Sequence, residues 1–232
     1  MEAYVITMAN NEVSLKGFRN LEASSRKVNN SFNINKFDAI MPGMVKAITL
    51  GNGLKWNYPW SGSQSDIKSG LVKSAYATSN PETRIACALS HWLLWNKCLK
   101  EDTPLLILEH DSFFLHKLDF KSILKSNYDI VGINSPAAAT RKAHKYHDLI
   151  QENSAWIQPV PTIDEFNIPQ GLAGNSAYII KQAGAKNLIE AVKEYGLWPN
   201  DAIMCKQFFP WMQVVYPYYT TIQRGLKSTT TS

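Results

Sequence analysis

The chain has 232 residues, with 24 Lys and Arg against 19 Asp and Glu, which gives a formal net charge of +5. Its 45% hydrophobic content excludes a compositionally disordered protein, and three widely spaced cysteines without a CxxC pair argue against a disulfide scaffold or a zinc ribbon. No apolar run approaches the roughly 18 residues of a membrane span. Residues 1–11 lack the charged n-region and the long apolar h-region of a signal peptide. We therefore expect a cytoplasmic protein without an integral membrane segment.

The first part of the chain predicts alternating strands and helices. Residues 3–8 are apolar and predict a strand, residues 14–29 predict an amphipathic helix, and residues 32–40 predict a second strand. A strand, a helix and a strand in this order indicate a βαβ unit. Residues 51–70 are punctuated by glycines and contain large aromatic residues, so we expect a loop there.

The second part continues this alternation, beginning with a helix over residues 81–99 that Asn80 can cap and whose first turn suits Pro81. The further expected elements are a strand over 105–108, helical residues at 120–124, a strand over 129–133, a turn and strand within 171–180, a helix over 183–195, a helix from 199 to about 208 and a strand at 214–215. Residues 134–170 lack periodicity, and a loop of this length is typically a lid or a binding segment. We expect one domain over 1–225 and a flexible tail over 226–232.

The pattern with the clearest chemistry follows the strand at 105–108, where the chain continues as Glu109, His110 and Asp111. In open α/β sheets, ligands bind beyond the carboxyl ends of the strands. Two acids separated by one residue at such an end can both reach a Mg²⁺ or Mn²⁺ ion that bridges a diphosphate. A solvated acidic turn is the alternative interpretation, because the pattern is short.

Six segments carry patterns that recur together in one known family. They are Val5–Met8, Phe37–Ile40, Cys87–Trp95, Leu106–Asp111, Gly174–Ile180 with Gly184–Lys186, and Pro199–Asp201. In this order they resemble glycosyltransferase family 25, which includes lipooligosaccharide galactosyltransferases and collagen-modifying relatives. His110 stands where the family usually has Asp, the first helix lacks the family's usual Arg pair, and residues 51–70 and 134–170 have no counterpart.

Two further strings, residues 168–175 and 198–201, together with the Ser-Thr-rich tail, resemble versions found in T-even-like phages. Some of these phages glycosylate hydroxymethylcytosine in their DNA. The resemblance therefore indicates a phage version of the family, which would act in the host cytoplasm.

The family resemblance implies an α/β fold of the GT-A type, with a Rossmann-like, mostly parallel sheet flanked by helices. It implies transfer of a sugar, with inversion, from a nucleotide-diphosphate sugar such as a UDP-sugar to a hydroxyl, assisted by Mn²⁺ or Mg²⁺. On this basis we expect Glu109 and Asp111 to hold the metal, with His110 left open as a further ligand, and Asp201 to be the catalytic base. A plain first-turn acid is the alternative for Asp201, because it follows Pro199 at the start of a predicted helix.

The remaining candidate residues would bind the donor or the acceptor. The expected donor-binding residues are Thr7, Ser90, His91, Arg141, Lys142, Gly171, Gly174 and Asn175. Each of these residues also has an interpretation without a ligand. Ser90 and His91 would then be a buried hydrogen-bonded pair, and the glycines would form a turn that leads into a strand. Arg141 and Lys142 would belong to a solvated basic stretch. We expect the acceptor to contact three tryptophans, Trp56, Trp60 and Trp211. They would stack on a base, or fill the space that a base leaves when it flips out of the duplex. Alternatively, they cover the edge of the core.

Three functions remain open at this point. The first is transfer of glucose or arabinose to 5-hydroxymethylcytosine in double-stranded phage DNA. The second is transfer to a sugar of lipopolysaccharide or lipooligosaccharide, with the basic surface docked on an anionic membrane face. The third is a non-catalytic nucleotide- or DNA-binding α/β module, which the His110 departure keeps open. The sequence does not determine the sugar, the linkage position or the oligomeric state.

Overall fold

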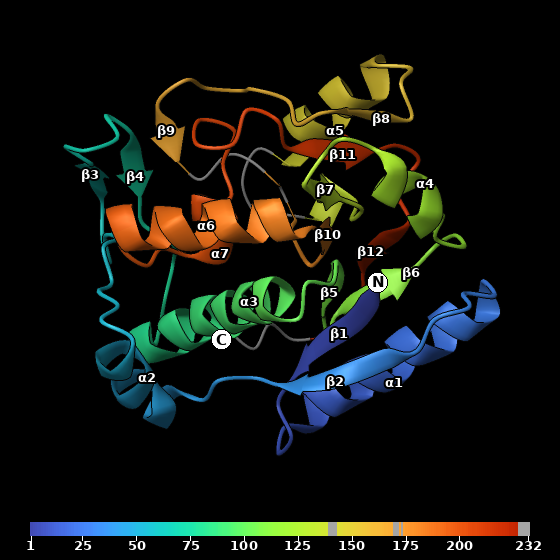
Figure 1. Cartoon of the computed structure of the whole chain (residues 1–232), viewed down its shortest axis with the longest axis horizontal. Coiled ribbons are helices and arrows are strands. Elements are labelled where there is room, and N and C mark those ends of the chain that lie inside the picture. Colours follow the sequence, from blue (N-terminus) through green and yellow to red (C-terminus); the bar gives the residue numbers. More distant parts are fainter. Residues whose placement is uncertain (139–142, 169–171, 173, 227–232) are drawn as a thin grey trace.

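The computed structural model describes residues 1–138, 143–168, 172 and 174–226, and its centre is a seven-stranded sheet (Figure 1). In spatial order the strands are β2 (Ile34–Asp38), β1 (Glu2–Thr7), β5 (Leu105–Glu109), β10 (Ala177–Ile180), β7 (Ile130–Gly132), β11 (Gln213–Val215) and β8 (Ile157–Pro159). β1 pairs in parallel with β2 and β5, and β7 pairs in parallel with β11. β10 runs antiparallel to β5 and β7, and β8 runs antiparallel to β11, so five of the seven strands share one direction. The expected α/β fold with a mostly parallel sheet is confirmed.

Helices cover both faces of this sheet. The helices are α1 (Glu12–Lys27), α2 (Val45–Gly51), α3 (Pro81–Lys100), α4 (Phe120–Lys125), α5 (Ala143–Glu152), α6 (Gln182–Tyr195) and α7 (Asn200–Ile203). Successive side chains of a strand point to opposite faces, and Leu105 and Ile107 of β5 belong to the core that contains α3, α6 and α7. Leu106 and Leu108 belong to the second core, under α1 and α4.

Smaller elements lie around the central sheet. They are the strands β3 (Ser63–Ser65), β4 (Val72–Ser74), β6 (Ser112–Phe114), β9 (Asn167–Ile168) and β12 (Thr220–Ile222), and the 3-10 helices η1 (Pro42–Met44) and η2 (Pro136–Ala138). β3, β4 and β9 form one small sheet, and β6 and β12 form another. Figure 1 shows β3 and β4 next to the end of α6, to one side of the central sheet. None of the helices in the described ranges has the length and apolar character needed to cross a membrane.

Some boundaries differ from the expected ones. The predicted loop at 134–170 contains α5, because Ala143, Tyr146 and Ile150 form a buried stripe at helical spacing. The predicted loop at 51–70 begins at the end of α2 and contains β3. The helix predicted from 199 to about 208 ends at Ile203, because Met204 leaves the helical conformation with φ −76° and ψ 62°. Residues 227–232 of the predicted tail lie outside the described part of the chain, and the single-domain boundary stays a prediction.

The loop after β5 is held between α1 and the chain that follows β12. A Cβ atom on Gly17 of α1 would lie 2.6 Å from the carbonyl oxygen of His110, so only glycine allows this approach. Gln223 Nε2 donates hydrogen bonds to the carbonyl oxygens of Gly17 at 2.8 Å and His110 at 3.1 Å. The loop that carries the two predicted metal ligands is therefore fixed from both sides.

Candidate active site

Glu109 is the last residue of β5, at the carboxyl end of a central strand. Its Oε1 lies 3.1 Å from His91 Nε2 on α3, and its Oε2 accepts a hydrogen bond from Ser176 Oγ at 3.4 Å. His91 Nδ1 lies 2.9 Å from the hydroxyl of Tyr178, which accepts a hydrogen bond from Trp95 Nε1 at 2.8 Å. The His91 tautomer with hydrogen on Nε2 satisfies this series of hydrogen bonds, because Tyr178 then donates to Nδ1 and His91 donates to Glu109. Burial raises the pKa of Glu109, but the hydrogen bond from His91 helps to bring it below its usual range.

Asp111 lies two residues beyond Glu109 and adds a second carboxylate. Its Oδ1 is buried and has no hydrogen-bond partner among the described residues, whereas its backbone carbonyl accepts from the Gln223 N–H at 2.7 Å. Burial and the charge of Glu109 raise the pKa of Asp111 to about 7. A buried carboxylate oxygen without a partner, beside a second carboxylate, fits a hard divalent cation such as Mg²⁺ or Mn²⁺, because these ions prefer oxygen ligands.

A second group of potential metal ligands shares Glu109. One ligand atom each from Cys87, His91 and Glu109 lie within 4.8 Å of one another. Burial raises the pKa of the Cys87 thiol and so favours the neutral thiol over the thiolate that binds metals. Both ring nitrogens of His91 already lie within hydrogen-bond distance of protein groups. Glu109 and Asp111 are therefore the better candidate pair for a metal.

Asp201 lies in the first turn of α7, where the sequence predicts it. Its neighbour Asn200 attaches this short helix to two other segments. Asn200 Nδ2 donates to Asn175 Oδ1 at 2.9 Å, and Asn200 Oδ1 lies 3.9 Å from Cys87 Sγ on α3. The predicted donor residue Asn175 therefore helps to place the predicted base.

The charges of three carboxylates act on the Cys87 side chain. Besides burial, the negative charges of Glu109, Asp201 and Asp111 all raise the pKa of the Cys87 thiol. Burial also raises the pKa of Asp201, and the charge of Glu109 adds to this shift. The predicted metal ligands and the predicted base thus act as negative charges on the same side chain of α3.

A pocket lies at the carboxyl ends of β1, β2 and β5, next to this carboxylate cluster. Its lining includes Ile6 and Met8 at the end of β1, residues 39–42 after β2, and Cys87 and His91 of α3. An apolar wall with polar groups at one end is typical of small-molecule sites. The sequence analysis missed the contributions of Met8 and residues 39–42, for which the available signal was their position at the carboxyl ends of the predicted strands 3–8 and 32–40.

Two expected donor-binding residues, Ser90 and Thr7, have structural partners. The hydroxyl of Ser90 accepts from the Ile40 N–H and donates to the Ala86 carbonyl, both at 2.9 Å, so it joins the segment after β2 to α3 while lining the pocket. Thr7 is buried, and its carbonyl accepts from the Ala39 N–H at 2.7 Å. Thr7 does not line this pocket, although both of its chain neighbours do.

The other expected donor-binding residues lie farther along the chain. Gly174 has a φ of +62°, which favours glycine, and its carbonyl accepts from Asn134 Nδ2 at 2.8 Å. This bond attaches the turn before β10 to the end of β7. Arg141, Lys142 and Gly171 lie outside the described residues.

The predicted acceptor-binding tryptophans do not form one group. Trp56 and Trp60 stack, with ring centroids 4.9 Å apart and an interplanar angle of 9°, and Trp60 is 41% exposed. Trp211 instead packs against Phe209, with ring centroids 5.7 Å apart. Trp60 presents an exposed ring, whereas Trp56 and Trp211 both pack against the core.

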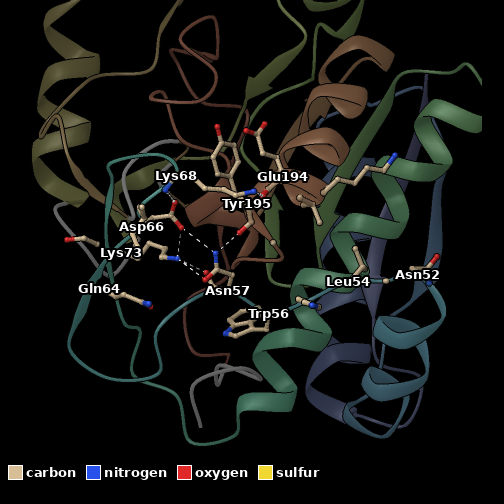
Figure 2. Close-up of a pocket in the computed structure, with 17 residues that line it drawn as sticks. Asn52, Leu54, Trp56, Asn57, Gln64, Asp66, Lys68, Lys73, Glu194 and Tyr195 are labelled. Atoms are coloured by element: carbon tan, nitrogen blue, oxygen red, sulfur yellow. Dashed lines mark hydrogen bonds and ion pairs between the residues drawn. The ribbon is translucent and has the colours of Figure 1, made fainter.

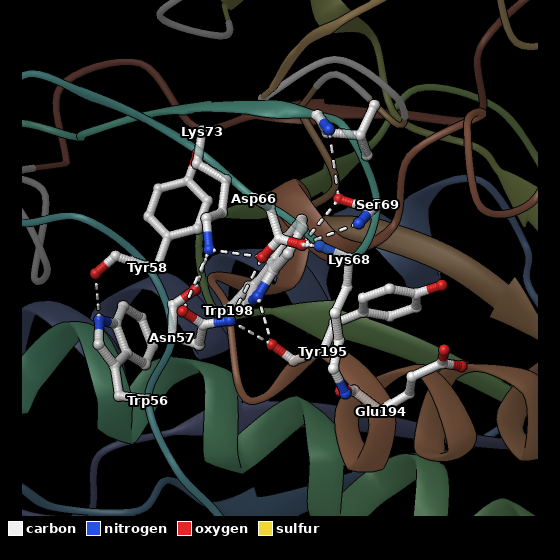
Figure 3. Close-up of polar contacts among 11 residues, drawn as sticks. Trp56, Asn57, Tyr58, Asp66, Lys68, Ser69, Lys73, Glu194, Tyr195 and Trp198 are labelled. Carbon is white, nitrogen blue, oxygen red and sulfur yellow. Dashed lines mark hydrogen bonds and ion pairs between the residues drawn. The ribbon is translucent and has the colours of Figure 1, made fainter.

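Trp56 also lines a second pocket of about 610 Å³ (Figure 2). Its walls are residues 52–57, residues 64–68 and the end of α6 with the following turn at 192–196. Figure 3 shows the polar network beside it, in which Lys73 Nζ lies 2.9 Å from Asp66 Oδ2 and donates to the Asn57 carbonyl at 2.9 Å. Asn57 Nδ2 donates to the Tyr195 carbonyl at 2.7 Å. The network therefore ties the segment that carries the two stacked tryptophans to α6.

Tyr76 and Arg84 also act on this site, and the sequence analysis missed them. Burial raises the pKa of Asp201, and the positive charge of Arg84 acts in the opposite direction. The guanidinium carbon of Arg84 lies 5.0 Å from the centroid of the Tyr76 ring. Tyr76 lies in a stretch without predicted structure, and a single basic residue near the start of a helix carries no functional signal of its own.

A comparison with protein families decides what kind of protein this is. The model of glycosyltransferase family 25, described as an LPS biosynthesis protein family, matches residues 2–204. The chain belongs to glycosyltransferase family 25. It is therefore a glycosyltransferase, and the resemblance predicted from the motifs is confirmed. The matched range runs from β1 to α7 and contains Glu109, Asp111 and Asp201.

Solved structures similar to this family 25 enzyme are glycosyltransferases at low sequence identity. GlyE of Streptococcus pneumoniae TIGR4 is 10% identical with a TM-score of 0.41, over 93% of this chain and 45% of the GlyE chain, so this chain spans less than half of GlyE. The galactosyltransferase LgtC, in complex with donor and acceptor sugar analogs, is 12% identical with a TM-score of 0.45, over 97% of this chain and 87% of LgtC. Mouse xyloside xylosyltransferase 1 is 9% identical with a TM-score of 0.41, over 90% of this chain and 79% of that protein. A sequence search among curated proteins gave no match.

Proposed function

We propose that this family 25 enzyme, with a GT-A-type arrangement, transfers a sugar from a nucleotide-diphosphate sugar, with UDP-sugars as the first choice, to a hydroxyl acceptor with inversion. The observation that supports this most directly is the acid pair at the end of β5, where Glu109 ends the strand and Asp111 Oδ1 is buried without a partner among the described residues, beside a pocket at the carboxyl ends of β1, β2 and β5. Such a site offers a nucleotide pocket, oxygen ligands for a cation on the diphosphate, and a base for the acceptor hydroxyl.

In this proposal the pocket between the ends of β1 and β2 and helix α3, with a volume of about 80 Å³, receives only part of the donor nucleotide. The apolar side chains of Ile6 and Met8 suit the faces of a base and a ribose. The diphosphate then extends toward Glu109 and Asp111, which would hold the metal. A bound Mn²⁺ or Mg²⁺ would offset the negative charge that builds up on the leaving nucleotide. His91 keeps the Glu109 carboxylate oriented by its hydrogen bond.

Asp201 is the proposed base. In an inverting displacement, the acceptor oxygen bonds to the anomeric carbon from the face opposite the leaving group, and the bond from that carbon to the diphosphate oxygen breaks. The proton of the acceptor hydroxyl passes to a carboxylate oxygen of Asp201. The raised pKa of Asp201, caused first by burial, makes its carboxylate a stronger proton acceptor than an exposed aspartate.

For the acceptor we propose 5-hydroxymethylcytosine in double-stranded DNA, with glucose or arabinose as the transferred sugar. The net charge of +5 and the exposed ring of Trp60, stacked on Trp56, support an acceptor that carries phosphates and aromatic bases. A sugar of lipopolysaccharide or lipooligosaccharide is the second candidate, because the family that this chain belongs to is described by LPS biosynthesis.

Replacement of Asp201 by Asn tests this function. We expect a fall in kcat of about 10²- to 10⁴-fold, because a positioned base contributes that much to proton transfer, with little change in UDP affinity. The measurement is UDP release from a panel of UDP-sugars with Mn²⁺, in the presence of either a hydroxymethylated duplex or a lipooligosaccharide. Asp102→Asn is the matched control, because Asp102 is an exposed turn residue with a φ of 49°, which asparagine also tolerates. A wild-type rate for Asp201→Asn would remove Asp201 as the base, and an absence of UDP release with every donor would overturn the function.

A further inference from the structure

Gln223 follows directly after β12 and binds the loop that carries the acid pair. Its side-chain Nε2 donates to the carbonyl oxygens of His110 at 3.1 Å and Ser112 at 3.0 Å. Its backbone N–H donates to the carbonyl oxygen of Asp111 at 2.7 Å. One residue from the last part of the described chain thus binds the carbonyls of three consecutive residues, the middle one of which is a predicted metal ligand.

Helix α1 holds the Gln223 amide in a fixed orientation. The amide Nε2 also donates to the Gly17 carbonyl at 2.8 Å, and the amide Oε1 accepts from Asn20 Nδ2 at 2.9 Å. The bond from Asn20 determines which side of the amide is the oxygen, so the two N–H groups face the carbonyls of Gly17 and the acid loop. The Gln223 side chain therefore joins α1 to this loop through both ends of its amide.

These bonds bear directly on the direction of the Asp111 side chain. Asp111 lies in the turn between β5 and β6, two strands that belong to different sheets. The two peptide planes that flank its Cα carry the carbonyls of His110 and of Asp111 itself, and Gln223 binds both. Because the peptide unit is planar, fixing both planes fixes φ and ψ of Asp111 and with them the direction of its Cα–Cβ bond. Its Oδ1 is buried and has no hydrogen-bond partner among the described residues, so this backbone is what orients it.

We propose that Gln223 is a positioning residue, which directs the Asp111 carboxylate toward the metal. The proposal rests on the proposed function, in which Glu109 and Asp111 hold the cation. Gln223 acts through the loop rather than as a ligand, because its amide nitrogen is a donor and its amide oxygen accepts from Asn20. Gln223 also lies beyond residues 2–204, which match the family model, so this role comes from the contacts of the residue and not from a family motif.

Calorimetric titration of Mn²⁺ in the presence of UDP tests this role. Gln223→Met keeps the approximate length of the side chain and removes every side-chain hydrogen bond. We expect it to weaken Mn²⁺ binding by about 10- to 100-fold, as is typical for groups that orient metal ligands, with little change in the affinity for UDP without metal. Gln64→Met is the matched control, because Gln64 is an exposed residue of β3, and it should leave both affinities unchanged. Equal losses of Mn²⁺ and UDP affinity in Gln223→Met would indicate general disruption of the site and would overturn the proposal.

Two further variants test the assigned orientation of the amide. Gln223→Glu keeps the size of the side chain but replaces the donor by a carboxylate oxygen that faces three carbonyl oxygens, so it should weaken Mn²⁺ binding at least as much as Gln223→Met does. Asn20→Ala removes only the bond that orients the amide, and it should weaken Mn²⁺ binding less than Gln223→Met does. Wild-type Mn²⁺ affinity in Gln223→Glu would overturn the proposal.

A double-mutant cycle separates positioning of Asp111 from an independent effect. If Gln223 acts through Asp111, then Gln223→Met made in the Asp111→Asn background should weaken Mn²⁺ binding far less than it does in the wild type. An equal loss in both backgrounds would overturn the proposal. Failure of the proposed function gives a different result, because Asp111→Asn alone would then bind Mn²⁺ with the wild-type affinity.

A crystal structure of metal-free Gln223→Met supplies a readout that depends on neither activity nor binding. We expect the backbone at residues 110–112 and the Asp111 carboxylate to be displaced from their wild-type positions, with β5 in place. An undisplaced Asp111 carboxylate would contradict the positioning role. If Gln223→Met fails to fold, the same titration and crystal structure are made with Asn20→Ala, whose substitution is at an exposed position of α1. A wild-type Mn²⁺ affinity and an undisplaced loop in that variant would then overturn the proposal.

Discussion

At the scale of single residues, Asp111 is the position where a bound metal would be detected most directly. Its Oδ1 is buried and, within the described ranges, without a hydrogen-bond partner, whereas the two carboxylate oxygens of Glu109 lie 3.1 Å from His91 and 3.4 Å from Ser176. A cation is therefore the partner that best fits Asp111, because its pKa is already raised to about 7 by burial and by Glu109.

Replacement of Asp111 by Asn should weaken Mn²⁺ binding by at least about 10-fold. Mutation of a residue that only hydrogen-bonds to a metal ligand already costs about this much, and loss of a ligand should cost at least as much. The affinity is measured by calorimetric titration of Mn²⁺ in the presence of UDP. Cys87→Ser is the control and should leave the affinity unchanged, because Cys87 is a neutral thiol next to the acids. If Cys87→Ser weakens Mn²⁺ binding more than Asp111→Asn does, the metal belongs to the group of Cys87, His91 and Glu109.

The sequence predicts some residues of the site better than others. Glu109 and Asp111 follow directly from an apolar strand that runs into two acids, and Asp201 follows from a family motif; all three act as charges on Cys87. The pairing of Tyr76 with Arg84 could not be predicted, because it is a contact between α3 and an irregular segment. No spacing along the chain records such a contact.

At the scale of secondary structure elements, the segment from Trp56 to β4 is held by one buried ion pair. Lys73 on β4 and Asp66 have side chains that are only 1% and 6% exposed, and their charged atoms lie 2.9 Å apart. Lys73 also donates to Asn57, which is attached to the end of α6 through Tyr195 (Figure 3). The position of the stacked tryptophans therefore depends on a charge pair that is removed from water.

Replacement of Lys73 by Met should lower the free energy of unfolding by about 3–5 kcal/mol, because it leaves the Asp66 carboxylate buried without its partner. Urea denaturation measures this change. Lys68→Met is the matched control and should cost much less, because the Lys68 side chain is exposed and its Nζ donates to the Glu194 carbonyl rather than to a buried carboxylate. A cost for Lys73→Met no greater than that for Lys68→Met would contradict a role of the buried pair in stability.

The same pair predicts a dependence on pH. Burial raises the pKa of Asp66, but hydrogen bonds from Lys73 and Ser69 outweigh this effect and lower the pKa overall. Because the unfolded-state pKa is about 3.9, the stabilisation by this carboxylate is present above that pH and is lost as the pH falls through the lower folded-state value. The difference in unfolding free energy between the wild type and Asp66→Asn should therefore shrink on acidification, and a difference that grows would contradict the assigned sign.

Elements with a strong local pattern could be predicted, and those that depend on packing could not. The helix at 81–99 was expected from Asn80 and Pro81, and Asn80 Oδ1 accepts from the Glu82 and Thr83 N–H groups at 3.0 and 3.4 Å. The segment around α5 reads as a loop because polar residues interrupt its short apolar stripe, although that stripe is buried in the structure. Short strands such as β3 and β9 form because a neighbouring segment supplies their hydrogen bonds.

At the scale of the whole molecule, the net charge of +5 and the exposed Trp60 bear on the choice of acceptor. If DNA is the acceptor, each phosphate contact should contribute about 0.9 to the slope of log K against log salt, so binding should weaken steeply with salt. Trp60→Ala should weaken duplex binding if its ring stacks on a base. Fluorescence anisotropy with a duplex that contains 5-hydroxymethylcytosine measures both effects.

The matched control for the acceptor is the same duplex with unmodified cytosine, which should bind with a similar salt slope but support no sugar transfer. Binding that is insensitive to salt would count against DNA. Transfer to a lipooligosaccharide and not to the hydroxymethylated duplex would instead establish the second candidate acceptor.

By itself, the sequence determined the family, the α/β architecture and the acids that follow β5. These features are recorded in short, contiguous patterns, since the period of a strand, a helix cap and an acid pair each span only a few residues. Only the tertiary structure decided that Arg84 lies over the Tyr76 ring, that Trp56 and Trp60 stack apart from Trp211, and that Lys73 is buried against Asp66. These contacts depend on how α3, α7 and the 55–76 segment pack, and the free energy of packing is set by shape and burial between distant segments rather than by local spacing.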